Sequence, residues 1–265
     1  MAEFLTGQVA IVTGASSGIG RDTALELARV GVRVVLASRN AAELQALATE
    51  IQRAGREAFV RVTDVGNPAD AARLVDDAVA RFGRIDIIVA SAGQYIRGTI
   101  ATRTLADFEA SLQVNFYGAL AVIQAALPHM LAARRGMVVA VSSVDGKKGL
   151  PLDGPYVAAK FALTGFMDVL RQELRGTGVH AVTILPGRVD TPMIASLDVP
   201  LISAKISSRR VARTIVRCVR RGVGTEVIVP FLGPSLLLWA HLLSPRLADA
   251  LVRIFKLEGV ELSQR

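Results

Sequence analysis

The chain has 265 residues, of which 51% are hydrophobic and 20% are charged. This length allows one large domain or two small ones with a sizeable core, and the composition excludes a disordered or low-complexity chain. The lone cysteine, Cys218, excludes an intrachain disulfide, and the three histidines are too scattered for metal-ligand spacing, so no metal site is expected.

The net charge of +8 is concentrated in one part of the chain. Residues 205–256 contain ten lysines and arginines but only two acids, Glu226 and Asp249, whereas the remainder is neutral overall. This distribution argues against a protein that coats nucleic acid, so no nucleic-acid partner is expected, and it indicates one local basic surface.

Short apolar, β-branched runs alternate with helical patterns along the chain. In chain order the patterns predict strand 9–12, helix 18–30, strand 32–37, helix 41–53, strand 58–62, helix 68–82, strand 85–90, helix 105–132, strand 136–141, helix 156–175, strand 180–185, helix 208–221 and strand 226–229. This alternation is typical of right-handed βαβ units. We therefore predict an α/β Rossmann fold, a doubly wound parallel sheet in one catalytic domain over 1–230, followed by an apolar, basic extension over 231–265.

Three glycines, Gly14, Gly18 and Gly20, follow the first predicted strand and open the first predicted helix. Glycines there let the backbone turn tightly and approach a pyrophosphate, which the N–H groups and dipole of the helix N-terminus favour. The spacing is a variant of the dinucleotide-binding fingerprint. An ordinary strand–helix turn is the alternative, and the position at the start of a βαβ unit favours the dinucleotide.

The second predicted strand ends at Ser38 and Arg39. An NAD site normally has an acid there, about 20 residues after the glycines, to bind the ribose 2′-hydroxyl. No acid is present, and an arginine can pair with a 2′-phosphate through charge-assisted hydrogen bonds. The sequence thus favours NADP(H) over NAD(H), with a solvated surface arginine as the alternative.

Tyr156 and Lys160 are four residues apart on a predicted helix and therefore project from one face. An ammonium beside a tyrosine stabilises the phenolate, and such a tyrosine can exchange a proton with an alcohol or ketone. The spacing alone is also typical of a surface pair. Ser142 and Ser143 follow a predicted strand at its carboxyl end, and Asn115 lies in an apolar helix, where a hydrogen-bonded core amide is the alternative interpretation.

In this order the residues resemble those of the short-chain dehydrogenase/reductase family, over about residues 5–230. The matching positions are Thr13–Gly20, Asp64-Val65, Ala92-Gly93, Asn115, Ser143, Tyr156, Lys160, Pro186-Gly187 and Thr191. The family's catalytic serine precedes the tyrosine by thirteen residues, which selects Ser143 over Ser142.

The resemblance implies a role for each catalytic residue. Tyr156 would be the general acid in reduction and the general base in oxidation, Lys160 would lower its pKa and bind the nicotinamide ribose, and Ser143 would bind the substrate oxygen. Asn115 would hold a water that connects Lys160 to solvent. The expected cofactor contacts are Gly14, Ser16, Ser17, Gly18, Ile19, Gly20, Ser38, Arg39, Asp64, Val65, Ala92, Gly93, Tyr156, Lys160, Pro186, Gly187, Val189 and Thr191.

One segment departs from the family pattern. Ala90-Ser91-Ala92-Gly93 stands where the family usually has Asn-Asn-Ala-Gly, whose asparagines brace the central sheet and the cofactor loop. Ser91 can replace part of one asparagine, but Ala90 offers no side-chain hydrogen bond. We expect this departure to affect cofactor affinity and not the catalytic groups.

The C-terminal part is both basic and apolar. Helix 208–221 is expected to bury an apolar face on the flank of the sheet and to expose six arginines, and two short helices are expected between Pro234 and Pro245 and over 245–257. Apolar residues with Trp239 and flanking cations are typical of an interfacial membrane element, which predicts peripheral membrane contact. A lid over the substrate cleft or a dimer contact is the alternative. The extension is similar to that of membrane-associated hydroxysteroid dehydrogenases of the family.

The sequence therefore predicts an oxidoreductase that transfers a hydride between NADP(H) and an alcohol/ketone pair, on an apolar lipid-, steroid- or retinoid-like substrate. A non-catalytic nucleotide-binding or membrane-scaffolding protein on the same fold is the alternative, which the complete catalytic set disfavours. A dehydratase or epimerase would have another glycine spacing and a larger C-terminal domain. The family implies a homodimer or homotetramer. No signal peptide is recognised, so we expect a cytoplasmic protein in peripheral contact with a membrane surface.

Overall fold

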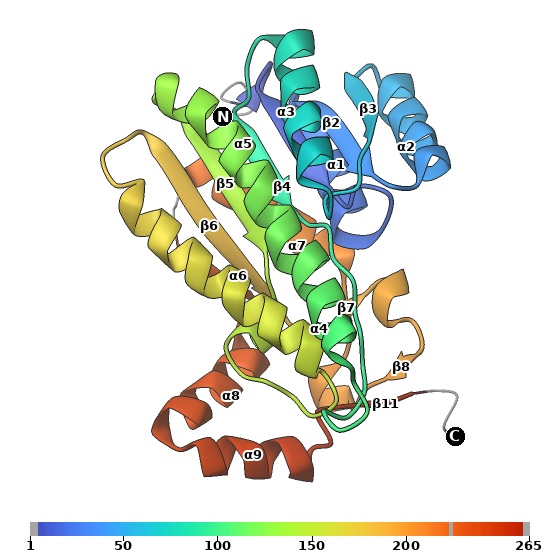
Figure 1. The fold of residues 1–265 in the computed structure, drawn as a ribbon, viewed down its shortest axis with the longest axis vertical. Helices are drawn as coiled ribbons and strands as arrows, with labels where there is room; N and C mark the ends of the chain where they lie inside the picture. Colours follow the sequence, from blue (N-terminus) through green and yellow to red (C-terminus); the bar gives the residue numbers. More distant parts are fainter. Residues whose placement is uncertain (1–4, 223–224, 262–265) are drawn as a thin grey trace.

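The computed structural model describes residues 5–222 and 225–261. Its central sheet contains seven strands: β1 (Val9–Thr13), β2 (Arg33–Ser38), β3 (Ala58–Val62), β4 (Ile87–Ala90), β5 (Gly136–Val141), β6 (Val179–Pro186) and β10 (Glu226–Val229). The strand order is β10-β6-β5-β4-β1-β2-β3, and every neighbouring pair is parallel (Figure 1). The predicted doubly wound parallel sheet is thereby confirmed.

The strands in the middle of the sheet are apolar along their whole length. All residues of β1 and β4 are buried, because helices cover both faces of the sheet and leave no solvent-facing positions. This explains why the sequence shows short continuous apolar runs here and not the alternation of a sheet with one exposed face.

Seven helices belong to the layers on the two faces: α1 (Gly18–Arg29), α2 (Ala41–Arg53), α3 (Pro68–Phe82), α4 (Leu105–Leu112), α5 (Gly118–Ala132), α6 (Gly154–Glu173) and α7 (Ser208–Arg221). Helices α1, α2 and α7 pack on one face, and α3, α5 and α6 pack on the other (Figure 1). Asn40 and Asn67 cap α2 and α3 by accepting hydrogen bonds from the N–H groups of Glu43 and Ala69. These caps account for helix starts that the sequence predicted.

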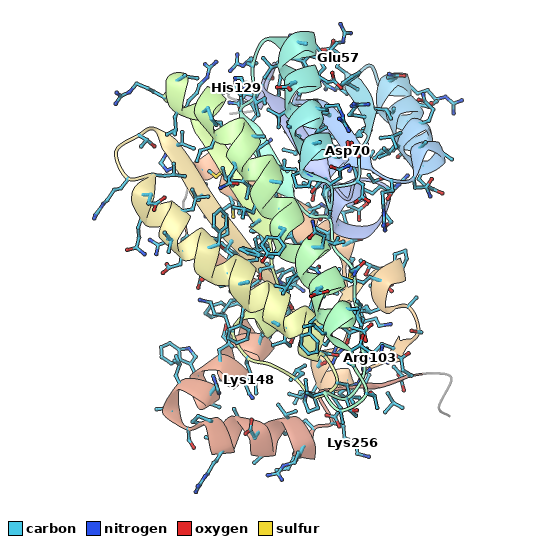
Figure 2. The ribbon with its side chains drawn as sticks, in the orientation of Figure 1. Glu57, Asp70, Arg103, His129, Lys148 and Lys256 are labelled. Atoms are coloured by element: carbon cyan, nitrogen blue, oxygen red, sulfur yellow. The ribbon has the colours of Figure 1, made fainter. Side chains whose placement is uncertain are left out.

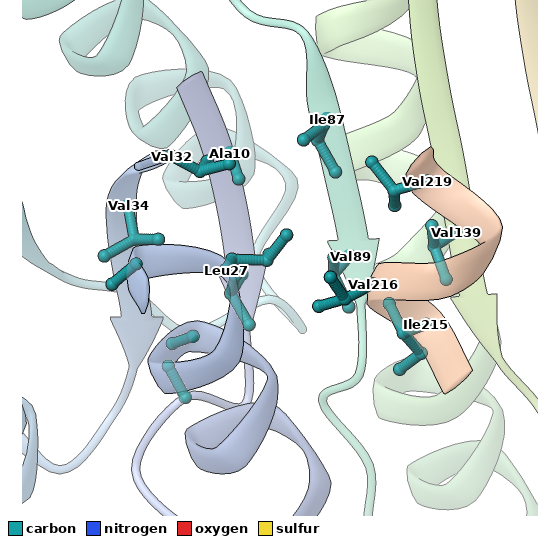
Figure 3. Close-up of a cluster of buried hydrophobic side chains, with 14 of the residues drawn as sticks. Ala10, Leu27, Val32, Val34, Ile87, Val89, Val139, Ile215, Val216 and Val219 are labelled. Carbon is teal, nitrogen blue, oxygen red and sulfur yellow. The ribbon is translucent and has the colours of Figure 1, made fainter. Parts of the chain in front are cut away.

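Helix α7 contributes its apolar stripe to the first of these two cores. Ile215 and Val216 are buried against the same face of the sheet as Val89 of β4 and Val139 of β5 (Figure 3). On the exposed side, Arg209 and Arg213 lie 2.8 and 3.6 Å from the carboxylate of Glu26 on α1. Part of the basic face predicted for this helix therefore forms ion pairs with its neighbour.

The single helix predicted over residues 105–132 is interrupted in the structure. A π-helical segment, η2 (Gln113–Tyr117), separates α4 from α5, and such turns occur frequently at functional sites. By length and composition alone the whole segment Leu105–Ala132 is long and apolar enough to cross a membrane, with a mean hydropathy of 1.3 over an 18-residue window. In this fold, however, Val122, Ile123 and Met130 of α5 are buried in the core on the sheet.

The segment between β6 and α7 contains small elements that the sequence did not predict. They are β7 (Val189–Asp190), η4 (Pro192–Ile194), β8 (Leu197–Asp198), η5 (Leu201–Ser203) and β9 (Ile206–Ser207). Strands and turns of two or three residues are too short to show a periodic pattern, so the sequence gives no signal for them.

The C-terminal extension forms two short helices, as predicted, and then returns to the catalytic domain. Helices α8 (Leu232–Leu243) and α9 (Pro245–Ile254) lie together at the end of the molecule where α6 begins (Figure 1). The following strand, β11 (Val260–Glu261), pairs with β8. The two units predicted from the sequence cover residues 1–230 and 231–265. Parts of both lie outside the described residues, namely 1–4, 223–224 and 262–265.

Candidate active site

A cavity of about 720 Å³ lies along the carboxyl ends of the parallel strands. One end is lined by the glycine turn after β1 and by the ends of β2 and β3, and the other by α6 and the C-terminal helices. The sheet order changes direction between β1 and β4, and a crevice forms at such a point in open α/β sheets. The cavity is therefore where this fold is expected to bind a ligand.

The glycine turn is shaped by close backbone contacts that exclude a side chain. Gly14 has a φ of +66°, and a Cβ there would lie 2.8 Å from the Cα of Ala92. A Cβ on Gly20 would lie only 2.3 Å from the carbonyl oxygen of Gly14. The N-cap residue of α1, Ser17, makes no side-chain capping bond, so the first N–H groups of the helix can bind an anion. These features fit a dinucleotide pyrophosphate.

The adenosine end of the cavity contains the residues predicted for it. Ser38, Arg39, Asp64 and Val65 all line the cavity at the ends of β2 and β3. The carboxylate of Asp64 accepts a hydrogen bond from the N–H of Gly66 at 3.0 Å, which fixes its orientation. Arg39 is exposed and forms no ion pair with an acid in residues 5–222 or 225–261, so its guanidinium is available for a phosphate.

The loop after β4 is braced in a way that the sequence did not reveal. The hydroxyl oxygen of Thr13 accepts hydrogen bonds from the backbone N–H groups of Ser91 and Ala92, at 3.1 and 3.2 Å. Any residue except proline supplies such N–H groups. This connection between β1 and the cofactor loop is thus independent of the asparagines that are absent at positions 90 and 91.

Asn115 lies in the π-helical segment and is fully buried. Its side-chain oxygen accepts a hydrogen bond from the N–H of Gln94, and its Nδ2 donates to the carbonyl oxygens of Gln94 and Ser111. The amide is thus a satisfied core group that holds the loop after β4. It is absent from the described lining of the cavity, and the water-holding role implied by the resemblance stays a prediction.

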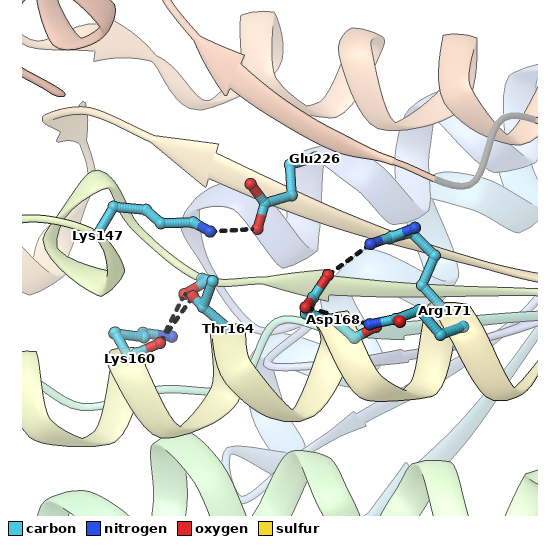
Figure 4. A network of polar contacts seen from close by, with 8 residues as sticks. Lys147, Lys160, Thr164, Asp168, Arg171 and Glu226 are labelled. Carbon is cyan, nitrogen blue, oxygen red and sulfur yellow. Dashed lines mark hydrogen bonds and ion pairs between the residues drawn. The ribbon is translucent and has the colours of Figure 1, made fainter. Parts of the chain in front are cut away.

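The two serines after β5 have different surroundings. The hydroxyl of Ser142 lies 2.8 Å from that of Thr164 and donates to the carbonyl oxygen of Lys160, so it connects β5 to α6. Figure 4 shows Thr164 and Lys160 on successive turns of α6. The hydroxyl of Ser143 instead lies beside the carboxylate of Asp145 in the cavity wall. This arrangement favours Ser143 as the substrate-facing serine.

Tyr156 and Lys160 project from one face of α6 into the cavity, as predicted. The ammonium nitrogen of Lys160 lies 5.5 Å from the ring centroid of Tyr156 and donates a hydrogen bond to the carbonyl oxygen of Val141 at 2.9 Å. Lys160 is only 4% exposed. The charge is thus held in place by main-chain atoms of β5.

Burial dominates the protonation of both groups. It lowers the pKa of Lys160 to about 8, although the charge of Asp145 opposes this shift. Burial and the nearby charges of Asp145 and Asp153 raise the pKa of Tyr156, while a hydrogen bond with Ser143 opposes the rise. Lys160 is not among the groups that shift the Tyr156 pKa here, so the lowering predicted for it stays a prediction, and the raised pKa favours the protonated hydroxyl.

Asp145 is a cavity residue that the sequence analysis missed. Burial and the charge of Asp153 raise its pKa to about 7, while Arg188, Ser143 and Lys160 oppose the rise. The sequence clue that could have identified Asp145 is its position two residues after Ser143. In the structure its backbone N–H donates a hydrogen bond to the serine hydroxyl oxygen at 3.1 Å.

A polar cluster missed by the sequence analysis joins the catalytic tyrosine to the C-terminal extension. The ring of Tyr95 packs edge-on against that of Tyr156, with 5.2 Å between centroids, and its hydroxyl donates to Asp153 at 2.5 Å. Arg97 lies 3.7 Å from the same carboxylate and donates to the carbonyl oxygens of residues 258 and 259. Arg188 donates likewise to residue 257. These arginines hold the chain after α9 through its backbone.

The remaining predicted contacts, Pro186, Gly187, Val189 and Thr191, line the cavity beside the catalytic residues. Apolar side chains of the C-terminal extension also line the cavity, among them Leu237, Leu251 and Phe255. An ion pair of 2.7 Å between Lys148 and Asp249 joins α9 to the loop after β5 (Figure 2). The cavity therefore has a polar catalytic side and an apolar side.

The chain is similar in sequence to known dehydrogenases and reductases. A family profile described as short chain dehydrogenase matches residues 8–200. The chain is 33% identical over 236 residues to the ketoacyl reductase HetN of Nostoc sp., covering 85% of this chain and 79% of that one. It is also 40% identical over 206 residues to an uncharacterised oxidoreductase of Myxococcus xanthus, covering 76% and 79%.

Among solved structures, an alcohol dehydrogenase from the archaeon Thermococcus sibiricus, complexed with 5-hydroxy-NADP, superposes with a TM-score of 0.76. It is 27% identical, and the match covers 83% of this chain and 95% of that chain. The family profile ends before the extension, so the similarity of that segment to membrane-associated hydroxysteroid dehydrogenases stays a prediction.

The raised pKa of Asp145 predicts a pH-dependent effect on stability. Between its ordinary pKa of 3.8 and about 7, the folded protein retains a proton that the unfolded chain releases, so the wild type loses stability as pH rises. Asp145→Asn has no proton to lose. We expect its free energy of unfolding, relative to wild type, to increase from pH 5 to pH 8 in urea denaturation. A difference that is constant with pH would contradict this expectation.

Proposed function

The chain belongs to the short-chain dehydrogenase family and is an NAD(P)-dependent oxidoreductase, and we propose that it transfers a hydride between NADP(H) and an alcohol/ketone pair on an apolar substrate. The observation that carries this proposal is the shared cavity. Ser143, Tyr156 and Lys160 line one part of it, and the dinucleotide-binding turn at Gly14–Gly20 lines another. A ligand that fills both parts would place its reactive end beside the tyrosine.

The catalytic residues are suited to proton transfer at a substrate oxygen. The nicotinamide cofactor, when bound, supplies the hydride in reduction and accepts it in oxidation. The raised pKa keeps Tyr156 protonated and ready to donate to a carbonyl oxygen, and Ser143 can hydrogen-bond the same oxygen. Lys160 places a cation beside the tyrosine ring, where it would stabilise the phenolate left by proton donation.

Two features support an apolar substrate. First, leucine side chains of α8 and α9, with Phe255 just after α9, line part of the same cavity as the catalytic residues. Burial of apolar surface favours binding by about 25 cal/mol for each Å², so such a wall selects a hydrophobic body. The extension thus acts as a cover over the substrate end, held by the main-chain contacts of Arg97 and Arg188.

The outer surface of this cover supports peripheral membrane contact. We propose that this surface binds a membrane that contains anionic lipids. Leu232, Leu242 and Leu243 of α8 are 75%, 75% and 81% exposed, and Trp239 is exposed beside them. Arg246 and Arg253 are exposed and add positive charge on α9, the helix that lies beside α8 (Figure 1). An apolar surface with a tryptophan and flanking cations matches the chemistry of a lipid headgroup boundary.

A first test replaces the proposed proton donor. Tyr156→Phe should lower kcat by about a thousandfold or more, because it removes the general acid while keeping the ring that packs on Tyr95. The assay is NADPH consumption over a panel of hydrophobic ketones and aldehydes, and NADPH affinity measured by fluorescence should change little. Turnover retained in this variant would refute the assigned role.

A second test addresses cofactor choice. Arg39→Ala should weaken NADPH binding by about tenfold and leave NADH binding unchanged, because only NADPH carries the 2′-phosphate. Arg53→Ala, another exposed arginine on the following helix, is the matched control and should alter neither affinity. If wild-type protein binds NADH as tightly as NADPH, the preference for NADP(H) is wrong.

A third test addresses the membrane surface. The full chain should sediment with vesicles that contain phosphatidylglycerol, and the double variant Trp239→Asp, Leu243→Asp should remain in the supernatant. Val169→Asp, which places the same charge at an exposed apolar position on α6, should sediment like wild type. Equal sedimentation of all three proteins would remove the proposed contact.

A further inference from the structure

The carboxylate of Asp145 lies beside the serine that faces the substrate. The hydroxyl of Ser143 donates to Asp145 Oδ2 at 3.3 Å, and both residues line the cavity. Apart from Asp64 at the adenosine end, Asp145 is the acid in the described lining of the cavity. The carboxylate therefore belongs to the polar, catalytic side of the cavity.

Asp145 forms no ion pair with a lysine or arginine in the described parts of the chain, and its Oδ1 has no hydrogen-bond partner there. Asp153, by contrast, is held by the hydroxyl of Tyr95 and by Arg97. A cavity carboxylate whose side-chain partner is the substrate-facing serine is free to accept a hydrogen bond from a ligand.

We propose that Asp145 binds a hydroxyl group on the carbon adjacent to the reacting carbon, so that the substrate is a vicinal hydroxyketone or diol with an apolar remainder. This inference rests on the hydride transfer proposed above and narrows its substrate class. Ser143 Oγ and Asp145 Oδ2 lie only 3.3 Å apart, so two oxygens on neighbouring carbons of one ligand can reach the two residues at the same time. The reacting oxygen can therefore meet Ser143 while the second oxygen meets Asp145.

The surrounding charges favour a neutral hydroxyl over an ammonium group as this donor. Lys160 on α6 and Arg188 after β6 both act on Asp145 electrostatically, and Asp153 is the acid that faces it. A cationic substrate would approach Lys160 and Arg188, which repel it at short range. A hydroxyl donates to the carboxylate without that penalty.

The test measures binding separately from turnover. The full-length protein, saturated with NADPH at pH 8 so that neither ligand can be oxidised, is titrated calorimetrically with 1,2-octanediol and with 2-octanol, which differ by one hydroxyl. We expect the diol to bind about tenfold more tightly than the alcohol to wild type. Asp145→Ala should bring the two affinities to within about twofold, mainly by weakening the diol. Asp145→Asn, which keeps an acceptor oxygen, should give an intermediate ratio.

Asp168→Asn is the matched control, because this exposed acid on α6 pairs with Arg171 away from the cavity and should leave the ratio unchanged. Equal affinities for the two ligands in wild type, or a ratio that Asp145→Ala does not change, would overturn the inference. Absence of Tyr156-dependent oxidation of either ligand, with the Asp145-dependent ratio intact, would instead contradict the proposed reaction and support the binding site.

Discussion

The parallel pairing of β1 with β4 is the constraint on which the site depends. Ala10, Ile11 and Val12 pair with residues 87–89, and the chain then leaves the two strands toward opposite sides of the sheet. The resulting crevice brings the glycine turn after β1 next to the loop after β4, close enough that Gly14 nearly touches Ala92. The Thr13 hydroxyl holds the two loops together, so the cofactor end and the catalytic end share one cavity.

Burial sets the electrostatics of that cavity. Lys160, Tyr156 and Asp145 are withdrawn from water, and each is shifted toward its neutral form. A cofactor that brings its own charge would change the protonation of all three groups at once. Helix α6, which carries Tyr156 and Lys160, and the turn after β5, which carries Asp145, therefore present groups whose protonation depends on what is bound.

Much of this arrangement could be predicted from sequence, because it is encoded in local patterns. The layers of the sheet follow from short-range periodicity, the glycine turn from its motif, and the set of Ser143, Tyr156 and Lys160 from the resemblance to the family. The π-helical turn at Asn115, the brace at Thr13 and the Asp153 cluster could not be predicted, because each depends on contacts between segments distant in the chain. Asp145 carries no periodic signal, and only the folded structure shows that it lines the cavity beside Ser143.

The contacts of Arg97 and Arg188 with the C-terminal segment also affect how the substrate range of such an enzyme can change in evolution. Arg97 and Arg188 donate hydrogen bonds to the backbone carbonyl oxygens of residues 257–259. Every amino acid supplies such an oxygen. Anchoring of the C-terminal helices is therefore largely uncoupled from the side chains that those helices turn toward the cavity. Mutations in α8 and α9 can remodel the wall that meets the substrate while its attachment persists, so the range of accepted substrates can drift between related genes without loss of the fold.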